Sequence, residues 1–347
     1  MSKLAFGCDY MEGAHENIMR KLCETNMEKT AGYGLDPYSD SARDRIRKAC
    51  GCPNAEVDLL VGGTQTNATC IDALLRSYQG VIAPATGHVS VHEAGAIEFG
   101  GHKVLGIPHK NGKITAEQIG NYIRDYYNDG NHDHMVMPGM VYISQPTEYG
   151  TLYSKKELTE ISRVCRENGI YLYVDGARLA YAIACQENDV SLSDLARLCD
   201  VFYIGGTKCG ALFGEAVVIP DPELIPHFFS IIKQHGALFA KGRILGIQFD
   251  ELFRDDLYMR IGEPAIRNAD RIRSALAENG YRLFFETPTN QIYVVFENER
   301  LPELASRVEY GFWEKYDDSH TVIRFSTSWA TKDEDVDELV RILMEMA

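Results

Sequence analysis

The feature that most constrains this chain is an alternation of short apolar runs with amphipathic helical segments, which continues through most of the sequence. Such alternation is typical of βα units, in which the strands form a mainly parallel sheet and the intervening helices cover it. The runs that we expect to be strands of this sheet cover residues 57–61, 140–143, 170–174, 201–204 and 216–219. The sequence therefore predicts an α/β fold.

One unit shows both halves of the pattern. Ser154 and Glu157 have the spacing of a capping box, so a helix should begin after Ser154. Apolar residues then recur on one helical face until Asn168-Gly169, which should end the helix. The next run, Ile170 to Val174, is apolar on both faces, as a buried parallel strand should be, and it leads directly into Asp175.

The pattern changes beyond about Ile244. Helical segments follow one another there, and later strand-like runs cover residues 291–296 and 322–326. A chain of 347 residues has room for about two domains. We therefore expect a large domain over residues 1–245, including an N-terminal segment, and a smaller α+β domain over residues 246–347.

Composition excludes several classes of protein. Fifty acidic and 35 basic residues give a net charge of −15, and no stripe rich in Lys and Arg could follow a phosphate backbone, so we expect no nucleic acid partner. No apolar run approaches the roughly 18 residues of a membrane span, and the first residues lack the apolar stretch of a secretory signal. Nine cysteines cannot all pair, which favours free thiols in the cytoplasm.

Ligands of open α/β sheets bind outside the carboxyl ends of the strands, and the first reactive segment in such a position is Gly62-Gly-Thr-Gln-Thr-Asn67. The glycines allow close backbone approach, and Thr64, Thr66 and the free N–H groups of a following helix suit a phosphate. A plain capped turn is the alternative for this segment alone, and the segment does not match G-x-G-x-x-G.

Asp175-Gly-Ala-Arg178 also follows a predicted buried strand. A buried carboxylate keeps its charge only beside a cationic partner such as a protonated ring nitrogen. The alternative for this segment is an ion pair between Asp175 and Arg178 that caps the next helix.

Gly205-Gly-Thr-Lys208 follows another apolar strand. A desolvated lysine has a lowered pKa and can form a Schiff base, whereas an exposed turn lysine is the alternative. A phosphate cradle, a strand-end Asp and a later strand-end Lys together predict a site for pyridoxal phosphate.

The sequence resembles the fold-type I pyridoxal phosphate enzymes, and within them the threonine aldolase and β-eliminating lyase group, over nearly its whole length. Three motifs of the first half are similar to those of the group: Tyr33-Gly-Leu-Asp-Pro37 to Y-G-x-D-P, Gly63-Thr64 to S-G-T, and His88 to Gly95 to H-x-x-x-x-E-A-G. Three more follow: Asp175 to Arg178 is identical to D-G-A-R, Thr207-Lys208 matches S-K, and Ile323 to Trp329 resembles I-R-x-x-T. The resemblance implies a mainly parallel seven-stranded sheet with flanking helices and a small C-terminal α+β domain.

The resemblance also implies roles for these residues. Lys208 would carry pyridoxal phosphate in a Schiff base, Asp175 would hold the pyridine nitrogen, and His88 would stack on the ring. Arg324 would grip the α-carboxylate of the substrate. The remaining expected contacts are those of Gly63, Thr64 and Thr207 with the cofactor, of Arg178 with the cofactor or the substrate, and of Cys8 and Tyr33 with the substrate.

Three segments depart from the pattern of the group. Ser144-Gln-Pro-Thr-Glu148 stands where threonine aldolases carry E-N-T-H, so the histidine that contacts the substrate hydroxyl is absent, and His88, Glu93 or Glu148 are our hypotheses for the base. Cys8-Asp9 replaces Ser-Asp, and a thiol is a weaker donor than a hydroxyl. Lys233 and Lys241 lie in a region that in relatives supplies cations to the phosphate of the neighbouring subunit, but either lysine alone is more typical of solvated surface charge.

The histidines of the sequence suggest no metal site. His88, His92 and Glu93 have a spacing that could place ligands one helical turn apart, but no third ligand from another segment is evident. The pair His132 and His134 lies in a polar loop and is typical of solvated surface. We expect no metal.

We therefore expect an enzyme that cleaves L-threonine or L-allo-threonine into glycine and acetaldehyde, acting as a homodimer or homotetramer with sites at the subunit interface. A β-eliminating lyase, or another pyridoxal phosphate reaction on an amino acid, would share the same cofactor residues. Two alternatives from other classes are a nucleotide-dependent oxidoreductase that uses Gly62-Gly63 for a pyrophosphate, and a binder of amino acids without turnover.

Overall fold

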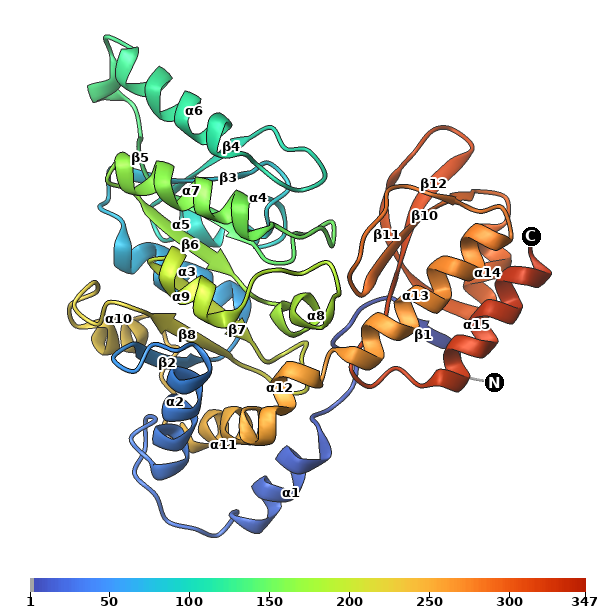
Figure 1. Cartoon of the computed structure of the whole chain (residues 1–347), viewed down its shortest axis with the longest axis horizontal. Helices are drawn as coiled ribbons and strands as arrows, with labels where there is room; N and C mark the ends of the chain where they lie inside the picture. The colour runs from blue at the N-terminus through green and yellow to red at the C-terminus, as the bar shows by residue number, and fades with distance from the viewer. Residues whose placement is uncertain (1–2) are drawn as a thin grey trace.

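The larger of two sheets has seven strands in the computed structural model, which describes residues 3–347 (Figure 1). Their order across the sheet is β2-β8-β7-β6-β5-β3-β4. The strands are β2 (Glu56–Leu60), β3 (Gln79–Pro84), β4 (Lys103–Ile107), β5 (Met137–Ser144), β6 (Tyr171–Asp175), β7 (Val201–Gly205) and β8 (Glu215–Ile219). Strands β4, β3, β5, β6 and β7 pair in parallel, and β8 runs antiparallel to both β7 and β2. The prediction of an α/β fold with a mainly parallel seven-stranded sheet is confirmed.

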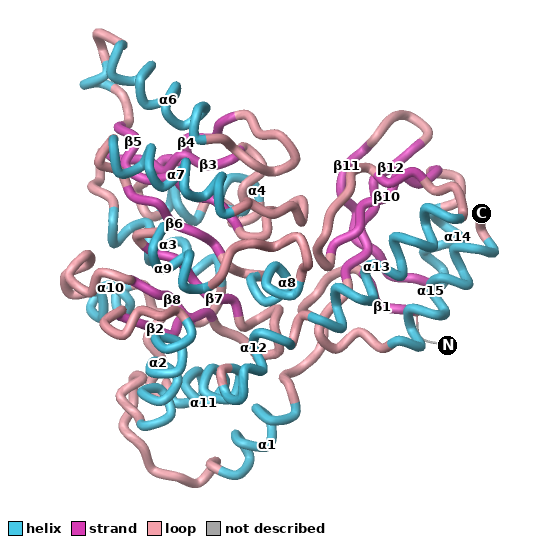
Figure 2. Tube along the Cα trace, viewed as in Figure 1, coloured by secondary structure: helices cyan, strands magenta, loops and turns pink. Residues whose placement is uncertain are grey.

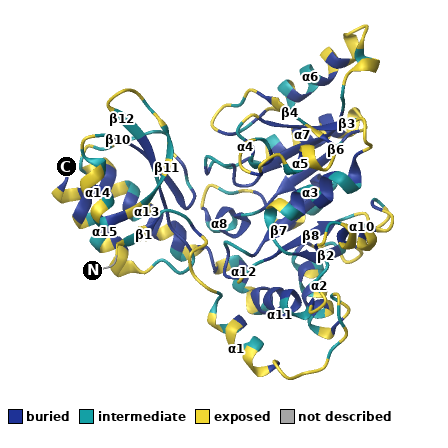
Figure 3. Ribbon diagram, turned by 180° about the vertical axis from the view of Figure 1, so that it is seen from behind, coloured by how far each residue is buried: buried dark blue, intermediate teal, exposed yellow. Residues whose placement is uncertain are grey.

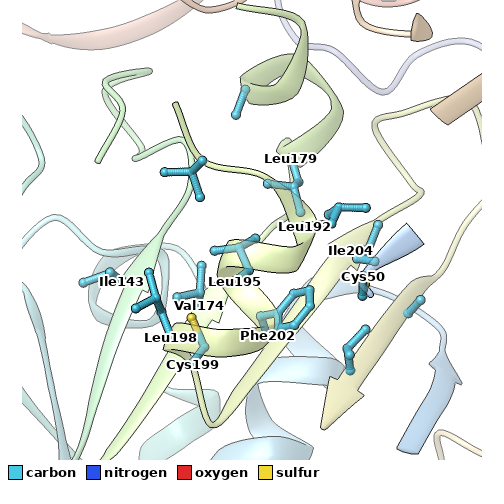
Figure 4. Packing of buried hydrophobic residues seen from close by; sticks show 14 of the residues in the cluster. Cys50, Ile143, Val174, Leu179, Leu192, Leu195, Leu198, Cys199, Phe202 and Ile204 are labelled. Carbon is cyan, nitrogen blue, oxygen red and sulfur yellow. The ribbon is translucent and has the colours of Figure 1, made fainter. Parts of the chain in front are cut away.

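Helices pack on both faces of this sheet, because successive side chains of each strand point to opposite sides. In β5, Val141 and Ile143 belong to one apolar cluster, and Met140 and Tyr142 belong to the other. Figure 4 shows the first cluster, where side chains of the sheet meet Leu192 and Leu195. The helices of this region are α1 (Glu16–Glu24), α2 (Pro37–Ala49), α3 (Gly63–Leu74), α4 (His88–Val91), α5 (Ala96–Phe99), α6 (Ala116–Asn128), α7 (Lys155–Glu167), α8 (Leu179–Ala184), α9 (Leu192–Leu198), α10 (Phe228–Gln234), α11 (Arg243–Leu252) and α12 (Leu257–Arg260), with the 3₁₀ helices η1 (His132–His134) and η2 (Arg254–Asp256).

The second sheet has the order β1-β11-β12-β10-β9 and packs on helices of the C-terminal region (Figure 2). Its strands are β1 (Leu4–Phe6), β9 (Arg282–Leu283), β10 (Gln291–Glu297), β11 (Val308–Lys315) and β12 (His320–Ser326), and its helices are α13 (Glu263–Glu278), α14 (Leu301–Arg307) and α15 (Asp333–Glu345). Strand β1 pairs in parallel with β11, so this N-terminal strand lies in the small sheet and not with the large domain of residues 1–245 that contains it. Phe6 is the reason, since it is buried in the apolar cluster of the small sheet against Phe325.

The local predictions are confirmed where side chains determine the backbone. Ser154 and Glu157 form the capping box, α7 begins at Lys155, and Gly169 has the positive φ of a helix end. Helix α3 ends at Leu74, and Tyr78 beyond it is exposed. Strands β1, β3, β4, β9 and β11 are further elements that the sequence patterns did not predict.

Further features of the molecule bear on function. Figure 3 shows that most of the large sheet is buried and that most exposed residues lie on the outer helices and loops. None of the helices found between residues 3 and 347 is long and apolar enough to cross a membrane. The carboxyl ends of β5 and β6 are in register, with Ser144 beside Asp175, and β7 follows next in the sheet, so the segments after these strands meet at one edge.

Candidate active site

A cleft of about 700 Å³ lies at this edge, between the large and the small sheet. The large sheet contributes Arg178, Thr207 and Lys208 to its wall, from the segments that follow β6 and β7. His88 at the start of α4 lines the cleft as well, and Arg324 reaches it from β12. The structure thus brings together five of the residues predicted for the site.

Asp175 lies beneath this cleft and is 3% exposed. Its carboxylate accepts four hydrogen bonds: Oδ1 from the Tyr203 hydroxyl at 2.6 Å and the Ala177 N–H at 2.9 Å, and Oδ2 from the Tyr142 hydroxyl at 2.6 Å and Asn67 Nδ2 at 3.2 Å. Two carboxylate oxygens offer about four acceptor positions, so a cofactor ring nitrogen would share an oxygen with one of these donors. All four donors are neutral.

The beginning of α3 lies next to this carboxylate. Gly63 is adjacent to Tyr203, because a Cβ at Gly63 would lie 3.1 Å from the tyrosine hydroxyl oxygen. The helix has Gly62 as its N-cap with no side-chain capping bond, so its first N–H groups are free for an anion. Thr64 is exposed at this end, and neither it nor Gly63 lines the cleft.

The turn that carries Lys208 is held by a buried carboxylate. Glu215 accepts hydrogen bonds from the Thr207 hydroxyl at 2.9 Å and the Gly206 N–H at 3.1 Å, and the Thr207 hydroxyl oxygen accepts from the Gly214 N–H at 3.0 Å. Burial raises the pKa of Glu215 to about 7, against the opposing effects of the Lys208 charge and these hydrogen bonds. Thr207 is therefore part of the frame that presents Lys208.

Arg178 forms a buried ion pair, but its partner is Asp9 and not Asp175. Its Nε and Nη2 donate to the two Asp9 oxygens at 2.7 and 3.0 Å. Burial acts to raise the pKa of Asp9, but the charge and hydrogen bonds of Arg178 outweigh it and lower the pKa to about 2. The alternative that Arg178 pairs with Asp175 is wrong, because Tyr203, Tyr142, Asn67 and the Ala177 N–H occupy that carboxylate.

Arg324 has no carboxylate partner of the kind that Asp9 provides for Arg178. Its Nη1 donates to Gln291 Oε1 at 3.0 Å, and its Nη2 donates to the Gly7 carbonyl at 3.1 Å. Within residues 3–347 its Nε is buried and has no hydrogen-bond partner, and the same is true of Gln291 Nε2 and Ser326 Oγ nearby on the small sheet. Buried donors without partners are costly, so this wall of the cleft suits a ligand that accepts hydrogen bonds.

His88 forms a chain of hydrogen bonds with acidic and amide side chains. Its Nδ1 lies 2.7 Å from Glu93 Oε1, which also accepts from Asn67 Nδ2 at 2.7 Å. Burial acts to lower the pKa of His88, but the hydrogen bond with Glu93 and the charges of Glu148 and Asp175 raise it overall. Burial raises the pKa of Glu93, more than its bonds with His88 and Asn67 lower it.

The alternative of metal ligands at His88, His92 and Glu93 finds no support in the structure. Glu93 turns its carboxylate into the protein, and its Oε1 is occupied by His88 and Asn67. Across residues 3–347 no group of three or more His, Cys, Asp or Glu side chains is arranged to hold a metal ion. His132 and His134 lie in η1, where His134 is exposed.

Five of the predicted contacts do not line the cleft of this chain: Asp175, which lies beneath it, and Gly63, Thr64, Cys8 and Tyr33. Cys8 stands between Gly7, which binds Arg324, and Asp9, which binds Arg178, so its backbone is close to both arginines. Tyr33 is 41% exposed in a loop, where the Lys233 amine lies 4.4 Å from the centre of its ring.

The sequence patterns indicate no role for four residues that support the site: Tyr142, Tyr203, Glu215 and Asp9. The two tyrosines stand within apolar strands, where the pattern is that of core residues. Asp9 was noted as a neighbour of Cys8, but its partner is 169 positions away. Of the three hypotheses for the base, His88 and Glu148 line the cleft, whereas Glu93 is buried behind His88.

The residues present fit pyridoxal phosphate. An amine at Lys208, a buried carboxylate at Asp175 and the uncapped start of α3 provide for the aldehyde, the ring nitrogen and the phosphate of this cofactor. Buried hydroxyl oxygens without a partner in the described chain occur at Thr66 in α3 and at Thr86 in the cleft wall. A bound polar group would satisfy them.

Comparison with known proteins agrees with this arrangement. The family described as beta-eliminating lyase matches residues 8–296. A low specificity L-threonine aldolase from Pseudomonas aeruginosa is 31% identical over 97% of this chain and 96% of its own length. The structure of a Leishmania major threonine aldolase is 40% identical, covers 99% of both chains and superposes with a TM-score of 0.95. An aspartate aminotransferase from Thermus thermophilus, at 17% identity and a TM-score of 0.73, shares the fold.

These matches exclude the nucleotide-dependent oxidoreductase as an alternative, since the relatives span nearly the whole chain. They also account for the fold-type I architecture and for the pairing of a strand-end Asp with a later strand-end Lys. The chain belongs to the β-eliminating lyase family of pyridoxal phosphate-dependent enzymes.

Proposed function

We propose that this chain cleaves β-hydroxy-α-amino acids, with L-threonine or L-allo-threonine as substrate, into glycine and an aldehyde. The observation that carries the proposal is the pairing of two walls in one cleft, with Lys208 and Arg178 on one side and Arg324 on the other. Similarity over the whole length to proteins named threonine aldolase supports the choice of reaction.

The cofactor is bound by the wall of the large sheet. Lys208 would form the covalent bond with pyridoxal phosphate, Asp175 would bind its ring nitrogen, and Gly63, Thr64 and Thr207 would hold its phosphate. When bound, pyridoxal phosphate would supply an electron sink for the bond that breaks at Cα of the substrate. His88 would stack on the ring, and the hydrogen bond with Glu93 keeps the imidazole in place.

The substrate carboxylate is bound by the wall of the small sheet. The Nε of Arg324 has no hydrogen-bond partner among residues 3–347. An arginine can hold a carboxylate with two parallel hydrogen bonds. The carbonyl of Gly7 and the amide of Gln291 fix the guanidinium plane. Arg178, by contrast, is neutralised by Asp9 and contributes a fixed edge of the cleft.

We propose further that the active form is a homodimer or homotetramer in the cytoplasm. Tyr33, Lys233 and Lys241 support an assembly, because Tyr33 and Lys233 are clustered on a surface outside their own cleft and could serve the cleft of a neighbour. The nine cysteines are all free thiols, which supports a reducing compartment. Size measurement by light scattering tests the assembly.

Product analysis tests the proposed reaction. Protein loaded with pyridoxal phosphate should convert L-threonine into equal amounts of glycine and acetaldehyde, and Lys208→Ala should not. Pyruvate and ammonia from L-serine, without acetaldehyde from L-threonine, would assign β-elimination instead. Binding of threonine without any product would assign the binder without turnover.

A further inference from the structure

The cleavage that we propose requires a base, and this further inference rests on that proposed function. The proton of the β-hydroxyl must leave oxygen as the Cα–Cβ bond breaks and the aldehyde C=O forms, and Cα gains a proton to give glycine. The charged and titratable side chains of the cleft include His88, His92, Glu148, Arg178, Lys208 and Arg324. The cleft is also lined by Tyr10, Tyr149 and Glu314. The two arginines and Lys208 already have other roles, burial raises the pKa of Tyr10 and Tyr149, and Glu314 belongs to β11 of the small sheet, so His88, His92 and Glu148 remain as candidates.

His88 is the least suited of the three to accept a proton. Its Nδ1 is held by Glu93 at 2.7 Å, and Asn67 fixes Glu93 in turn. The pair with Glu93 and the charges of Glu148 and Asp175 raise the pKa of His88 in spite of its burial, which favours the protonated ring. With its Nδ1 held by Glu93 and its ring placed against the cofactor in the proposed function, His88 already has another role.

His92 differs from His88 in each of these respects. It follows α4, is exposed on the cleft wall, and its ring centre lies 5.6 Å from that of His88. No hydrogen bond joins its ring to another group in the described chain, so both ring nitrogens are available. Burial, together with the nearby charges of His88, Arg324 and Arg178, lowers the pKa of His92, against the opposing charge of Glu148. The neutral imidazole that a base requires is therefore the favoured form.

Glu148 is placed to assist this histidine. It lines the same cleft from the segment after β5, and its backbone carbonyl is fixed by the Tyr293 hydroxyl at 2.7 Å. Its negative charge stabilises the positive charge that His92 gains with a proton. An imidazole with a carboxylate nearby is the usual arrangement of a general base in proteins.

We propose that His92 is the general base that removes the β-hydroxyl proton, and that Glu148 supports it electrostatically. His92 takes the proton from the hydroxyl oxygen and becomes imidazolium as the Cα–Cβ bond breaks and the aldehyde C=O forms, and bound pyridoxal phosphate would supply the electron sink. The assignment supplies a histidine from the segment after His88, in place of the one missing between Ser144 and Glu148.

Two reactions of the same loaded enzyme separate this role from a structural one. Cleavage of L-threonine needs the hydroxyl base, whereas exchange of the α-proton of glycine with deuterated water does not. We expect His92→Asn to lower cleavage about a hundredfold or more, to leave glycine exchange within about threefold, and to remove the acid limb of the pH profile of kcat/KM. Glu148→Gln should reduce cleavage less than His92→Asn does, and His134→Asn, on the exposed 3₁₀ helix, is the control.

Several results would overturn the assignment. His92→Asn with cleavage close to that of the wild type would show that another group is the base, and selective loss in Glu148→Gln alone would identify Glu148. Equal loss of cleavage and exchange in His92→Asn would show a role in binding or folding instead. If the unmodified enzyme exchanges glycine but cleaves no β-hydroxy amino acid, the proposed function fails, and the role of His92 fails with it.

Discussion

The two walls of the cleft differ in how fully their charged groups are already bonded. On the wall of the large sheet, Asp175 has four neutral donors and Arg178 has the two oxygens of Asp9. On the wall of the small sheet, Arg324 retains a buried Nε without a partner among residues 3–347, beside a similarly unpaired amide nitrogen of Gln291. A saturated wall is rigid and positions a resident group, while an unsaturated wall gains hydrogen bonds when a ligand arrives.

Removal of the Lys208 amine is the most severe test of the saturated wall. Lys208→Ala should lower the turnover of L-threonine by about four orders of magnitude or more, because the covalent attachment of the cofactor is lost. The visible absorbance of the loaded protein should disappear as well. Unchanged absorbance would show that another lysine carries the cofactor.

Asp9 joins the two walls, and its replacement should have the largest effect on stability. Asp9→Asn leaves Arg178 buried without its counter-charge. Asp9 Oδ2, which accepts from Arg178 Nε, also accepts from Asn290 Nδ2 at 2.9 Å on the side of the small sheet. We expect a loss of about 3–5 kcal/mol in the free energy of unfolding, measured by urea denaturation.

Asp270→Asn is the matched control, since its pair with Arg273 is on the surface. That variant should lose less than about 1 kcal/mol. Equal losses in the two variants would contradict the view that Asp9 is a buried junction. Because the pKa of Asp9 is lowered to about 2, its contribution is present above the usual value of 3.8 and is lost as the pH falls through about 2.

Glu215 tests the saturated wall through pH. Its pKa is raised in the fold from 4.5 to about 7, so its stabilising contribution is complete below pH 4.5 and is lost as the pH rises through 7. Glu215→Gln cannot titrate. The difference in free energy of unfolding between this variant and the wild type, both without cofactor, should shift by about 2 kcal/mol in favour of the variant between pH 5.5 and 8. A difference that stays constant with pH would show that Glu215 does not titrate in this range.

Replacement of a tyrosine beside Asp175 should have the smallest effect among these variants. Tyr203→Phe removes one of the two 2.6 Å bonds to the carboxylate, which should weaken binding of pyridoxal phosphate about tenfold. Tyr153→Phe, which removes a buried hydroxyl beside Ile114, is the control. If both variants bind the cofactor like the wild type, the tyrosine hydroxyl does not support Asp175.

Sequence patterns predicted the saturated wall better than its supports. Asp175 ends a buried strand and Lys208 follows the end of another by three residues, so a local pattern places them at the edge of the sheet. Arg324 could be placed only by resemblance, because it lies within a strand and not at its end. Asp9, Tyr203 and Glu215 act through partners that are distant along the chain, and no local pattern contains that information.

The same limit applies to segments that the structure places elsewhere than the sequence suggests. Tyr33 was assigned to the substrate by its motif, but in this chain its loop packs near Lys233 and Ala240. Position in the sequence groups the N-terminal segment with the large domain, but Phe6 has its apolar partners in the small sheet. Both outcomes depend on tertiary packing, which overrides order along the chain.

The contrast between the walls is tested most directly by Arg324→Ala, with two constants measured on one preparation. Removal of the guanidinium should raise KM for L-threonine at least tenfold, while the dissociation constant of pyridoxal phosphate stays within about twofold of the wild type. An unchanged KM, or a parallel weakening of cofactor binding, would contradict the assignment of cofactor to the large-sheet wall and substrate carboxylate to the small-sheet wall.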